Sequence, residues 1–130
     1  SMCDGNKLLL QVPNDFNPIQ ESAIKELNLE KWWFCPPRHI SYFSPLGLKR
    51  LCEKAGFKCI DLLTTFPIDM FLLCGLNYRK EPDQGRKAHK MRTLFEENYI
   101  NTHGLEGIIK IYRNFALANI GREIIIVLQK

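Results

Sequence analysis

A histidine in a proline-rich loop is the residue of this sequence best suited to acid–base chemistry. His39 follows the adjacent prolines Pro36 and Pro37 and lies three positions before Tyr42. Histidine takes up and releases protons near neutral pH, and the two prolines restrict the loop that carries it. These features would suit a general base. A loop histidine that only hydrogen-bonds the backbone is the structural alternative, and the sequence leaves both open.

Two further stretches carry groups that suit the binding of a small molecule. Asn14 and Asp15 directly follow an apolar run at residues 7–12, and ligands of open α/β sheets bind beyond the carboxyl ends of the strands. The same two residue types also serve ordinary turns. Trp32, Trp33 and Phe34 would line a ligand pocket or, alternatively, fill part of the core. We expect one tryptophan to be packed and the other exposed.

Basic residues gather between positions 79 and 92, where their excess over acidic residues equals the net charge of the whole chain, +4. They are Arg79, Lys80, Arg86, Lys87, Lys90 and Arg92. Such a cluster would hold a phosphate-bearing or acidic ligand, such as a nucleotide-linked sugar, although a solvated helix face is the ordinary explanation. No stacking aromatic pattern lies within it, which argues against single-stranded nucleic acid. The isolated histidines show no metal-ligand spacing, so no metal site is predicted.

Length and composition limit the classes of protein to which the chain can belong. Its 130 residues suffice for one domain, 1–130, and 45% apolar with 25% charged residues excludes the disordered class. A net charge of +4 is weak for a nucleic-acid module, and no apolar run approaches the roughly 18 residues of a membrane span. Five cysteines without a Cys-x-x-Cys pair, and no secretory leader, favour a cytoplasmic protein. Ser1 and Met2 are expected to be a cloning remnant.

The elements that must position these residues alternate between strands and helices. Strands are predicted at residues 7–12, 57–66 and 123–129, and helices at 17–29, 44–55, 67–76, 86–99 and 102–120, with a loop at 77–85. Asn17 and Ser44 each precede a proline, which is typical of a helix start. Gln20 occupies the capping-box position of the first helix, Thr102 is expected to cap the last, and Gly121 is expected to end it. The order predicts an α/β fold.

The first strand is continuously apolar at its centre, Leu8-Leu9-Leu10. This run predicts a strand that is buried on both faces, as in the middle of a parallel sheet covered by helices. Three strands make a small sheet for such apolar segments. The sequence therefore looks like part of a larger α/β unit.

Four segments, in order along the chain, carry a resemblance to a known family. They are residues 5–14 (GNKLLLQVPN), 36–44 (PPRHISYFS), 48–57 (LKRLCEKAGF) and 121–127 (GREIIIV). They resemble, in turn, the fifth strand, the His-x-x-Tyr-Phe-Ser segment, the helix that leads through Ala-Gly-Phe into the sixth strand, and the last strand of class I S-adenosylmethionine-dependent methyltransferases. The resemblance covers essentially the whole chain. It implies the C-terminal portion of a Rossmann-like methyltransferase sheet, with three strands, the last antiparallel, and covering helices.

The half of the family's fold that binds the cofactor has no counterpart in this sequence. That half begins with a strand and a glycine-rich loop, where glycine lets the backbone approach the ligand closely. The eight glycines here are scattered, and none forms Gly-x-Gly after a strand. The resemblance therefore implies S-adenosylmethionine as cofactor of the intact enzyme, and no cofactor for this segment alone.

The resemblance also implies roles for the candidate residues. His39 would be the catalytic base, and the contacts to the acceptor would come from Asn14, Asp15, Arg38, Tyr42 and Trp33. The segment would form the acceptor wall of a bacterial-type enzyme that methylates a small molecule or a sugar intermediate, and would be inactive alone. The alternative is a non-enzymatic interaction module, which dimerises or binds a partner through an exposed strand edge and the aromatic loop.

The strand edge follows from the same comparison. In the family the fifth strand lies between the fourth strand and the antiparallel last strand, and the fourth has no counterpart here. The edge from Leu8 to Val12 would therefore carry unpaired backbone groups, which template association. We expect a second copy of the chain, a swapped segment or the missing N-terminal half to cover it.

Overall fold

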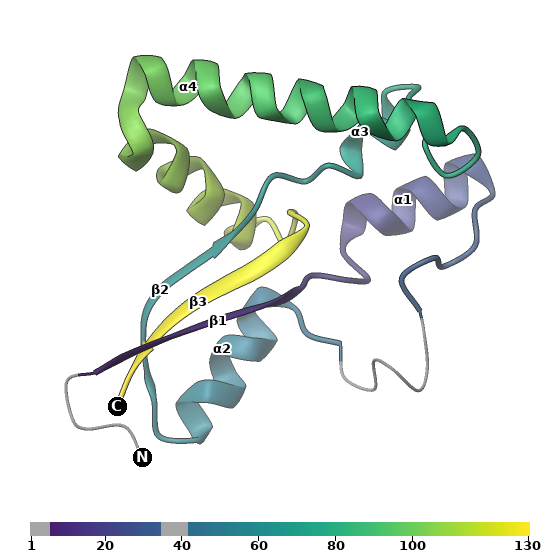
Figure 1. The fold of residues 1–130 in the computed structure, drawn as a ribbon. Helices are drawn as coiled ribbons and strands as arrows, with labels where there is room; N and C mark the ends of the chain where they lie inside the picture. The colour runs from purple at the N-terminus through teal and green to yellow at the C-terminus, as the bar shows by residue number, and fades with distance from the viewer. Residues whose placement is uncertain (1–5, 35–41) are drawn as a thin grey trace.

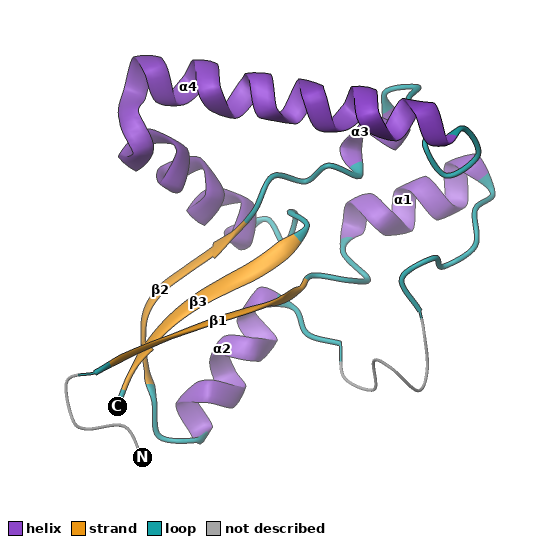
Figure 2. Cartoon of the chain, viewed as in Figure 1, coloured by secondary structure: helices purple, strands orange, loops and turns teal. Residues whose placement is uncertain are grey.

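The computed structural model describes residues 6–34 and 42–130 of the chain (Figures 1 and 2). Within them the elements follow the order β1 (Lys7–Pro13), α1 (Pro18–Leu27), α2 (Pro45–Lys54), β2 (Lys58–Thr64), α3 (Met70–Leu73), α4 (Pro82–Leu117) and β3 (Glu123–Gln129). The prediction of an α/β fold with three strands, the last antiparallel, is confirmed at this level. None of the helices in the described residues is long and apolar enough to cross a membrane.

The strands form one sheet in the order β1-β3-β2, and β3 runs antiparallel to both neighbours. The first strand pairs with an antiparallel last strand, as expected. The parallel pairing that its apolar run suggested is absent from the described sheet, because β1 and β2 run in the same direction but β3 separates them. The middle position suits the apolar strand β3, since it has a neighbouring strand on each side and its backbone groups are paired along both edges.

The first strand is an edge strand, which corrects the prediction that both of its faces are buried. Exposure alternates along β1: Leu8, Leu10 and Val12 are half-buried, whereas Leu9 is 59% exposed. A continuous apolar run in a sequence does not distinguish a strand covered on two faces from one covered on a single face. Only the position of β1 in the sheet settles this, and β3 is its one partner strand among the described residues.

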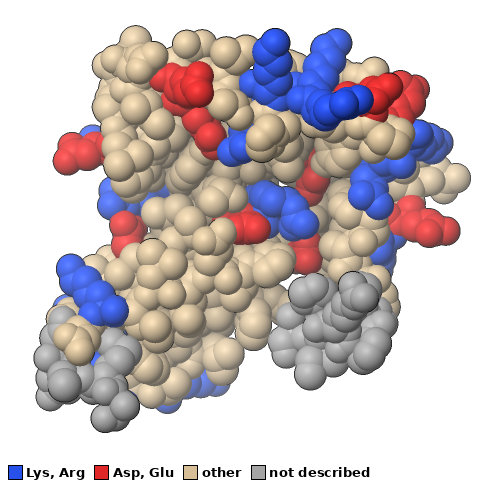
Figure 3. Space-filling model, in the orientation of Figure 1, with Lys and Arg blue, Asp and Glu red and all other residues tan. Residues whose placement is uncertain are grey.

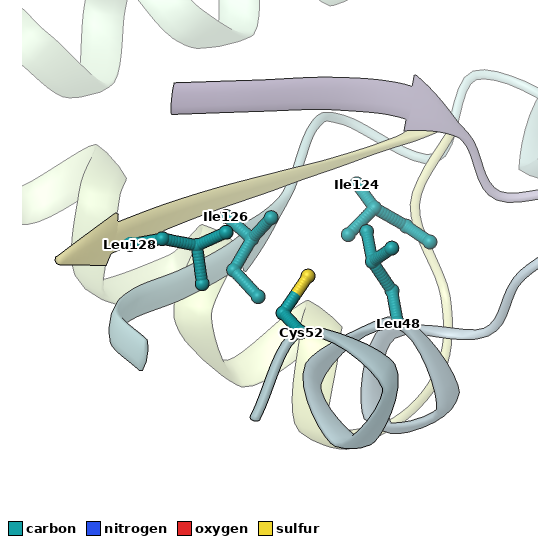
Figure 4. Packing of buried hydrophobic residues seen from close by; sticks show 5 residues of the cluster. All are labelled: Leu48, Cys52, Ile124, Ile126 and Leu128. Atoms are coloured by element: carbon teal, nitrogen blue, oxygen red, sulfur yellow. The ribbon is translucent and has the colours of Figure 1, made fainter. Parts of the chain in front are cut away.

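Helix α2 covers one face of the sheet and forms the main core with it. Leu48 and Cys52 point from α2 toward Ile124, Ile126 and Leu128 of β3, and all five are buried (Figure 4). These two helical residues are four positions apart and share one face of the helix, as the sequence predicts. Full burial of such a side chain stabilises the fold by about 1.5–3 kcal/mol.

The starts of α1 and α2 follow the sequence prediction. The Asn17 side chain accepts a hydrogen bond from the backbone N–H of Gln20, and the Ser44 hydroxyl accepts one from Gly47. Each cap satisfies one of the backbone donors that a helix start leaves unpaired. Helix α2 ends before Gly56, whose φ of 93° is in the left-handed region.

The second half of α4 packs against β2 on the side away from α2 (Figure 1). Arg113 of α4 makes two hydrogen bonds to the carboxylate of Asp61 in β2, at 2.9 and 2.8 Å. These bonds hold the pKa of Asp61 below its usual range. Helix α4 leaves the β1 side of this face open, which accounts for the exposure of Leu9.

Helix α4 joins two predicted helices into one element with a kink. Gly104 has φ 72° and ψ 175°, which are non-helical values that glycine tolerates. Thr102 lies in the turn before the kink, where its hydroxyl donates to the carbonyls of Asn98 and Tyr99. The prediction that Thr102 caps the last helix is therefore wrong.

The ends of α3 and α4 also differ from the predicted ones. Helix α4 begins at Pro82, inside the predicted loop, and ends at Leu117, before Gly121. Helix α3 spans four residues in place of the ten predicted. It begins at Met70, three residues late, and it ends before Gly75, which turns the chain with φ 94°. A proline within a polar stretch is as consistent with the first turn of a helix as with a loop.

Candidate functional site

The carboxyl ends of β1 and β2 and the start of β3 meet at one end of the sheet. Asn14 donates its backbone N–H to the carbonyl of Arg122 at 2.9 Å, and Arg122 donates its own to the carbonyl of Thr65 at 3.2 Å. The Asn14 side chain donates to the carbonyl of Gly121 at 3.2 Å. Two chain segments more than 100 positions apart are thereby fixed side by side.

A set of polar side chains gathers at this end of the sheet, and we call this set the polar cluster. Its members are Asn14, Asp15, Asn17, Gln20, Asp69, Tyr78 and Arg122. Four elements bring them together: the loop after β1, helix α1, the region around α3, and the start of β3. Five members are buried, so their positions are set by contacts within the protein.

Asp15 is the centre of one half of the cluster. Its Oδ1 atom accepts hydrogen bonds from Arg122 Nη1 at 2.9 Å and from Gln20 Nε2 at 3.2 Å. The Asp15 side chain is 7% exposed and that of Arg122 is 34% exposed. The ion pair therefore has its acidic member inside the protein and its basic member at the surface of a cavity.

Asp69 is the centre of the other half. Its Oδ2 atom accepts from Gln20 Nε2 at 3.2 Å, and its Oδ1 atom accepts a hydrogen bond from the Tyr78 hydroxyl. Burial, together with the neighbouring Asp69 carboxylate, raises the pKa of Tyr78 well above its usual value. Tyr78 therefore serves as a hydrogen-bond donor at any physiological pH and not as a base.

Gln20 links the two halves, and this replaces the capping-box role predicted for it. The Gln20 amide nitrogen reaches the two carboxylates, so the side chain does not reach back to the start of α1. Within the described part of the chain, the buried oxygens Oε1 of Gln20 and Oδ1 of Asn14 have no hydrogen-bond partner. Unpaired buried acceptors of this kind are uncommon and mark a cluster that packing alone does not explain.

Two cavities border the cluster and share Arg122 and Ile68. The larger, of about 310 Å³, lies between α4 and the strand ends and is lined by Thr65, Phe66, Ile68, His89, Arg92, Arg122 and Glu123. The smaller, of about 220 Å³, is lined by Trp32, Ile68, Asp69, Tyr78, Arg79, Gly85, Ala88 and Arg122. Figure 3 shows basic and acidic side chains in the middle of this face, between α4 and the sheet.

The structure brings together two of the residues predicted from sequence, Asn14 and Asp15. Trp33 and Tyr42 lie nearby and pack edge-on against Phe16, with ring centroids 5.4 and 5.0 Å away. Trp33 is buried, and Trp32 is the tryptophan that lines the smaller cavity. The prediction that one tryptophan is packed is confirmed for Trp33, whereas Trp32 is half-buried and not exposed as expected.

The predicted base, His39, and the predicted contact Arg38 lie outside the described residues. Their roles stay predictions.

Sequence reasoning missed the residues that complete the cluster: Gln20, Asp69, Tyr78 and Arg122. One signal was available for Arg122, which with Glu123 forms a charged pair between Gly121 and the continuously apolar run at 124–128. Gln20, Asp69 and Tyr78 gave no such signal. Their positions depend on how α1 and α3 pack beside each other, which local sequence does not specify.

The cluster supplies donors for an anionic or polar ligand, but the described residues do not supply a metal site. No three His, Cys, Asp or Glu side chains in the described ranges gather closely enough to hold a metal ion. Arg122 offers a guanidinium for carboxylate or phosphate oxygens, whereas the one hydroxyl proton of Tyr78 is already donated to Asp69.

No family model matches the chain, and comparison with curated proteins and with solved structures gave no match. The function is therefore inferred from the geometry of the polar cluster and from the sequence motifs.

Proposed function

We propose that this chain is the acceptor-side segment of an S-adenosylmethionine-dependent methyltransferase that acts on a small molecule or a sugar intermediate in the cytoplasm. The observation that carries the proposal is the polar cluster with its two cavities at the carboxyl ends of β1 and β2. Ligands of open α/β sheets bind beyond this end of the sheet, where the strands have their carboxyl ends.

Two features of the sheet support the proposal. The resemblance implies a first strand paired with an antiparallel last strand, and β1 pairs with β3 in this way over its whole length. It also implies an absent neighbour on the other side of that strand, and among the described residues β1 has no second partner. Both features depend on long-range pairing, which the sequence motifs do not specify.

The described residues do not fit the cofactor itself. Strand β1 leads into Pro13-Asn14-Asp15 and not into a glycine-rich turn, and the Asn14 and Asp15 side chains are already bonded to neighbours in the fold. We therefore assign cofactor binding to a segment other than this one.

The role we assign to this chain is to hold the acceptor and to take its proton. For an oxygen or nitrogen acceptor, transfer needs alignment and a base. We propose His39 for the base. For direct contacts to the acceptor we propose Arg38 and Tyr42. Asn14, Asp15 and Trp33 are buried and line neither cavity, so we assign them a positioning role, in which Asp15 acts through the guanidinium of Arg122 that it holds in place.

The alternative function is an interaction module that dimerises or binds a partner. The free side of β1 favours it, since an edge strand with exposed apolar side chains such as Leu9 is a template for strand pairing. Light scattering over a wide concentration range tests this. Leu9→Pro removes a backbone N–H donor from the strand. A dimer that the Leu9→Pro variant no longer forms would favour the interaction module, and a monomer at all concentrations would count against it.

The main proposal is tested by sequencing the transcript upstream of residue 1 and titrating S-adenosylmethionine into two purified chains. One chain is the present one and the other carries the upstream segment. We expect a strand, a glycine-rich loop and a helix upstream, and binding by the longer chain only. Micromolar binding by the present chain, or a longer chain that is folded and does not bind, would overturn the proposal.

A further inference from the structure

Three basic side chains from two distant segments converge on the larger cavity. His89 and Arg92 come from the first half of α4, and Arg122 comes from the residue before β3. Glu123 is the one carboxylate among the seven residues that line the cavity. The lining therefore carries a net positive charge. Thr65, Phe66 and Ile68 complete the wall with a hydroxyl and two apolar side chains.

Arg122 is held in place and retains free donors. Asp15 binds its Nη1 atom at 2.9 Å, and no other nitrogen of this guanidinium has a hydrogen-bond partner among residues 6–34 and 42–130. Asp15 does not line the larger cavity. A guanidinium has five N–H donors in a planar fork that matches two oxygens of a carboxylate or phosphate.

Arg92 is fixed in a similar way from the other side of the cavity. Its Nη1 atom binds both carboxylate oxygens of Glu96, at 3.2 and 3.1 Å, and its Nη2 atom lies 3.2 and 3.3 Å from the two ring nitrogens of His89. Glu96 does not line the cavity. Each arginine thus has its acidic partner outside the cavity, and each is oriented before a ligand arrives.

The adjoining smaller cavity offers room for the rest of a ligand. It shares Arg122 and Ile68 with the larger one and ends at Trp32, over which the Arg79 guanidinium lies at 5.1 Å from the ring centroid. An indole in the cavity wall suits the C–H face of a sugar ring or a flat aromatic ring. The two volumes together fall within the range of small-molecule sites, about 300–1,000 Å³.

We propose that this cleft binds the phosphate or carboxylate group of a small molecule between Arg92 and Arg122, with the remainder of the molecule directed toward Trp32. Describing this molecule as the methyl acceptor rests on the proposed function, and anion binding itself does not. The site takes a single anionic group, because Asp15, Glu96 and Glu123 offset much of the charge of the basic residues.

The test measures anion binding by the purified chain without any cofactor. Inorganic phosphate, glucose 1-phosphate and glucuronate are titrated at constant ionic strength and followed by NMR chemical shifts of the backbone amides. We expect saturable shifts at Thr65, Phe66 and Arg122, with dissociation constants of roughly millimolar, as for a single charged group. Tighter binding of the phosphates assigns the site to phosphate, and equal binding assigns it to both anions.

Variants with the same change of charge test the position of the site. Arg92→Gln and Arg122→Gln should each weaken binding by about tenfold or more, which corresponds to one lost charge-assisted contact of about 1.4 kcal/mol. Arg86→Gln is the matched control, since Arg86 lies on α4, has a side chain that is 86% exposed and does not line the cavity. It should leave binding within about twofold of the parent chain.

Two results would overturn the proposal. One is equal weakening by Arg86→Gln and Arg92→Gln, which would indicate general attraction to a basic surface. The other is no saturable shift with any of the three anions. Because Arg122→Gln also removes the partner of Asp15, circular dichroism must show that this variant is folded, and Arg92→Gln provides the same test without touching that pair. Failure of cofactor binding by the longer chain would leave these results unaffected.

Discussion

The middle and the start of β3 lie only a few residues apart and have opposite characters. From Ile124 to Leu128 alternate side chains are buried against α2. At Arg122 the same segment enters the polar cluster, where buried charges and amides meet two cavities. The first region is consistent at every level, from sequence pattern to packing. The second places polar groups where packing alone would favour apolar ones, which is typical of a functional region.

Removing a core side chain should have the largest effect. Ile126→Ala deletes buried methyl groups from the centre of β3, where the residue is 0% exposed, and should lower the free energy of unfolding by about 2–5 kcal/mol. Leu9→Ala is the control, since Leu9 lies on the neighbouring strand and is 59% exposed. It should change stability by about 0.5 kcal/mol or less. Urea unfolding of both variants measures this, and similar losses would contradict the assignment of the core to the α2 face.

Substitution of the glycine beside the polar cluster, Gly121, should lower stability by nearly as much. Gly121 has a φ of 111°, and an added Cβ would lie 2.4 Å from the Thr64 hydroxyl oxygen and 2.6 Å from the Thr65 carbonyl oxygen. Gly121→Ala should therefore cost about 2–4 kcal/mol from strain and overlap together.

Gly56→Ala separates these two causes. Gly56 has a φ of 93°, with no atom within 4 Å of the added Cβ, so that only backbone strain remains and the cost should be about 1 kcal/mol. Thermal unfolding of both variants gives the comparison. An equal loss in the two would mean that the close approach of the strand ends at Gly121 contributes nothing.

Breaking the ion pair of the polar cluster should have an intermediate effect. Asp15→Asn keeps the shape of the side chain but removes the charge that holds Arg122, and should cost about 1–2 kcal/mol. Asp83→Asn breaks the exposed pair with Arg86 and should cause no measurable change. Denaturant unfolding at neutral pH measures both. A stability gain for Asp15→Asn would show that the buried charge of Asp15 destabilises the fold and is retained for binding.

The ion pair on the face opposite α2 should give the smallest effect, and one that depends on pH. Arg113 lowers the pKa of Asp61 in the folded state, so the pair stabilises the fold above the ordinary carboxyl value of about 4. This contribution is lost as the pH falls through the lowered pKa. The stability difference between the parent chain and Asp61→Asn should therefore be constant from pH 7 to pH 5 and shrink at pH 3. Urea unfolding at these three values tests it, and a difference that does not change with pH would exclude the pair as its source.

Local features of the fold could be predicted from the sequence. The caps at Asn17 and Ser44 and the apolar face of Leu48 and Cys52 each depend on residues at most four positions apart. The joining of two predicted helices in α4 could not, since Gly104 is compatible with a kink as well as with a break. The exposed face of β1 also escaped prediction, because a run of three leucines has no alternation from which to read the covered face.

The residues of the candidate site also separate into those that the sequence could predict and those that it could not. Asn14 and Asp15 could be placed because they follow a strand, and ligands bind beyond strand ends. Arg122 and Asp69 could not, because Arg122 lies 107 positions from Asp15, and Asp69 lies 49 positions from Gln20. Nothing in the neighbouring sequence indicates which distant group either residue meets.

The sequence by itself determined where helices begin, which face of α2 is apolar, and that three apolar strands alternate with helices. These properties follow from side-chain periodicity and from the hydrogen bonds of helix ends, and both act over a few residues. The tertiary structure alone decided that β3 lies between β1 and β2 and that four distant segments share one polar cluster. Strand order depends on which edges pair after the whole chain has closed, and only this closure brings Arg92 and Arg122 to the same cavity.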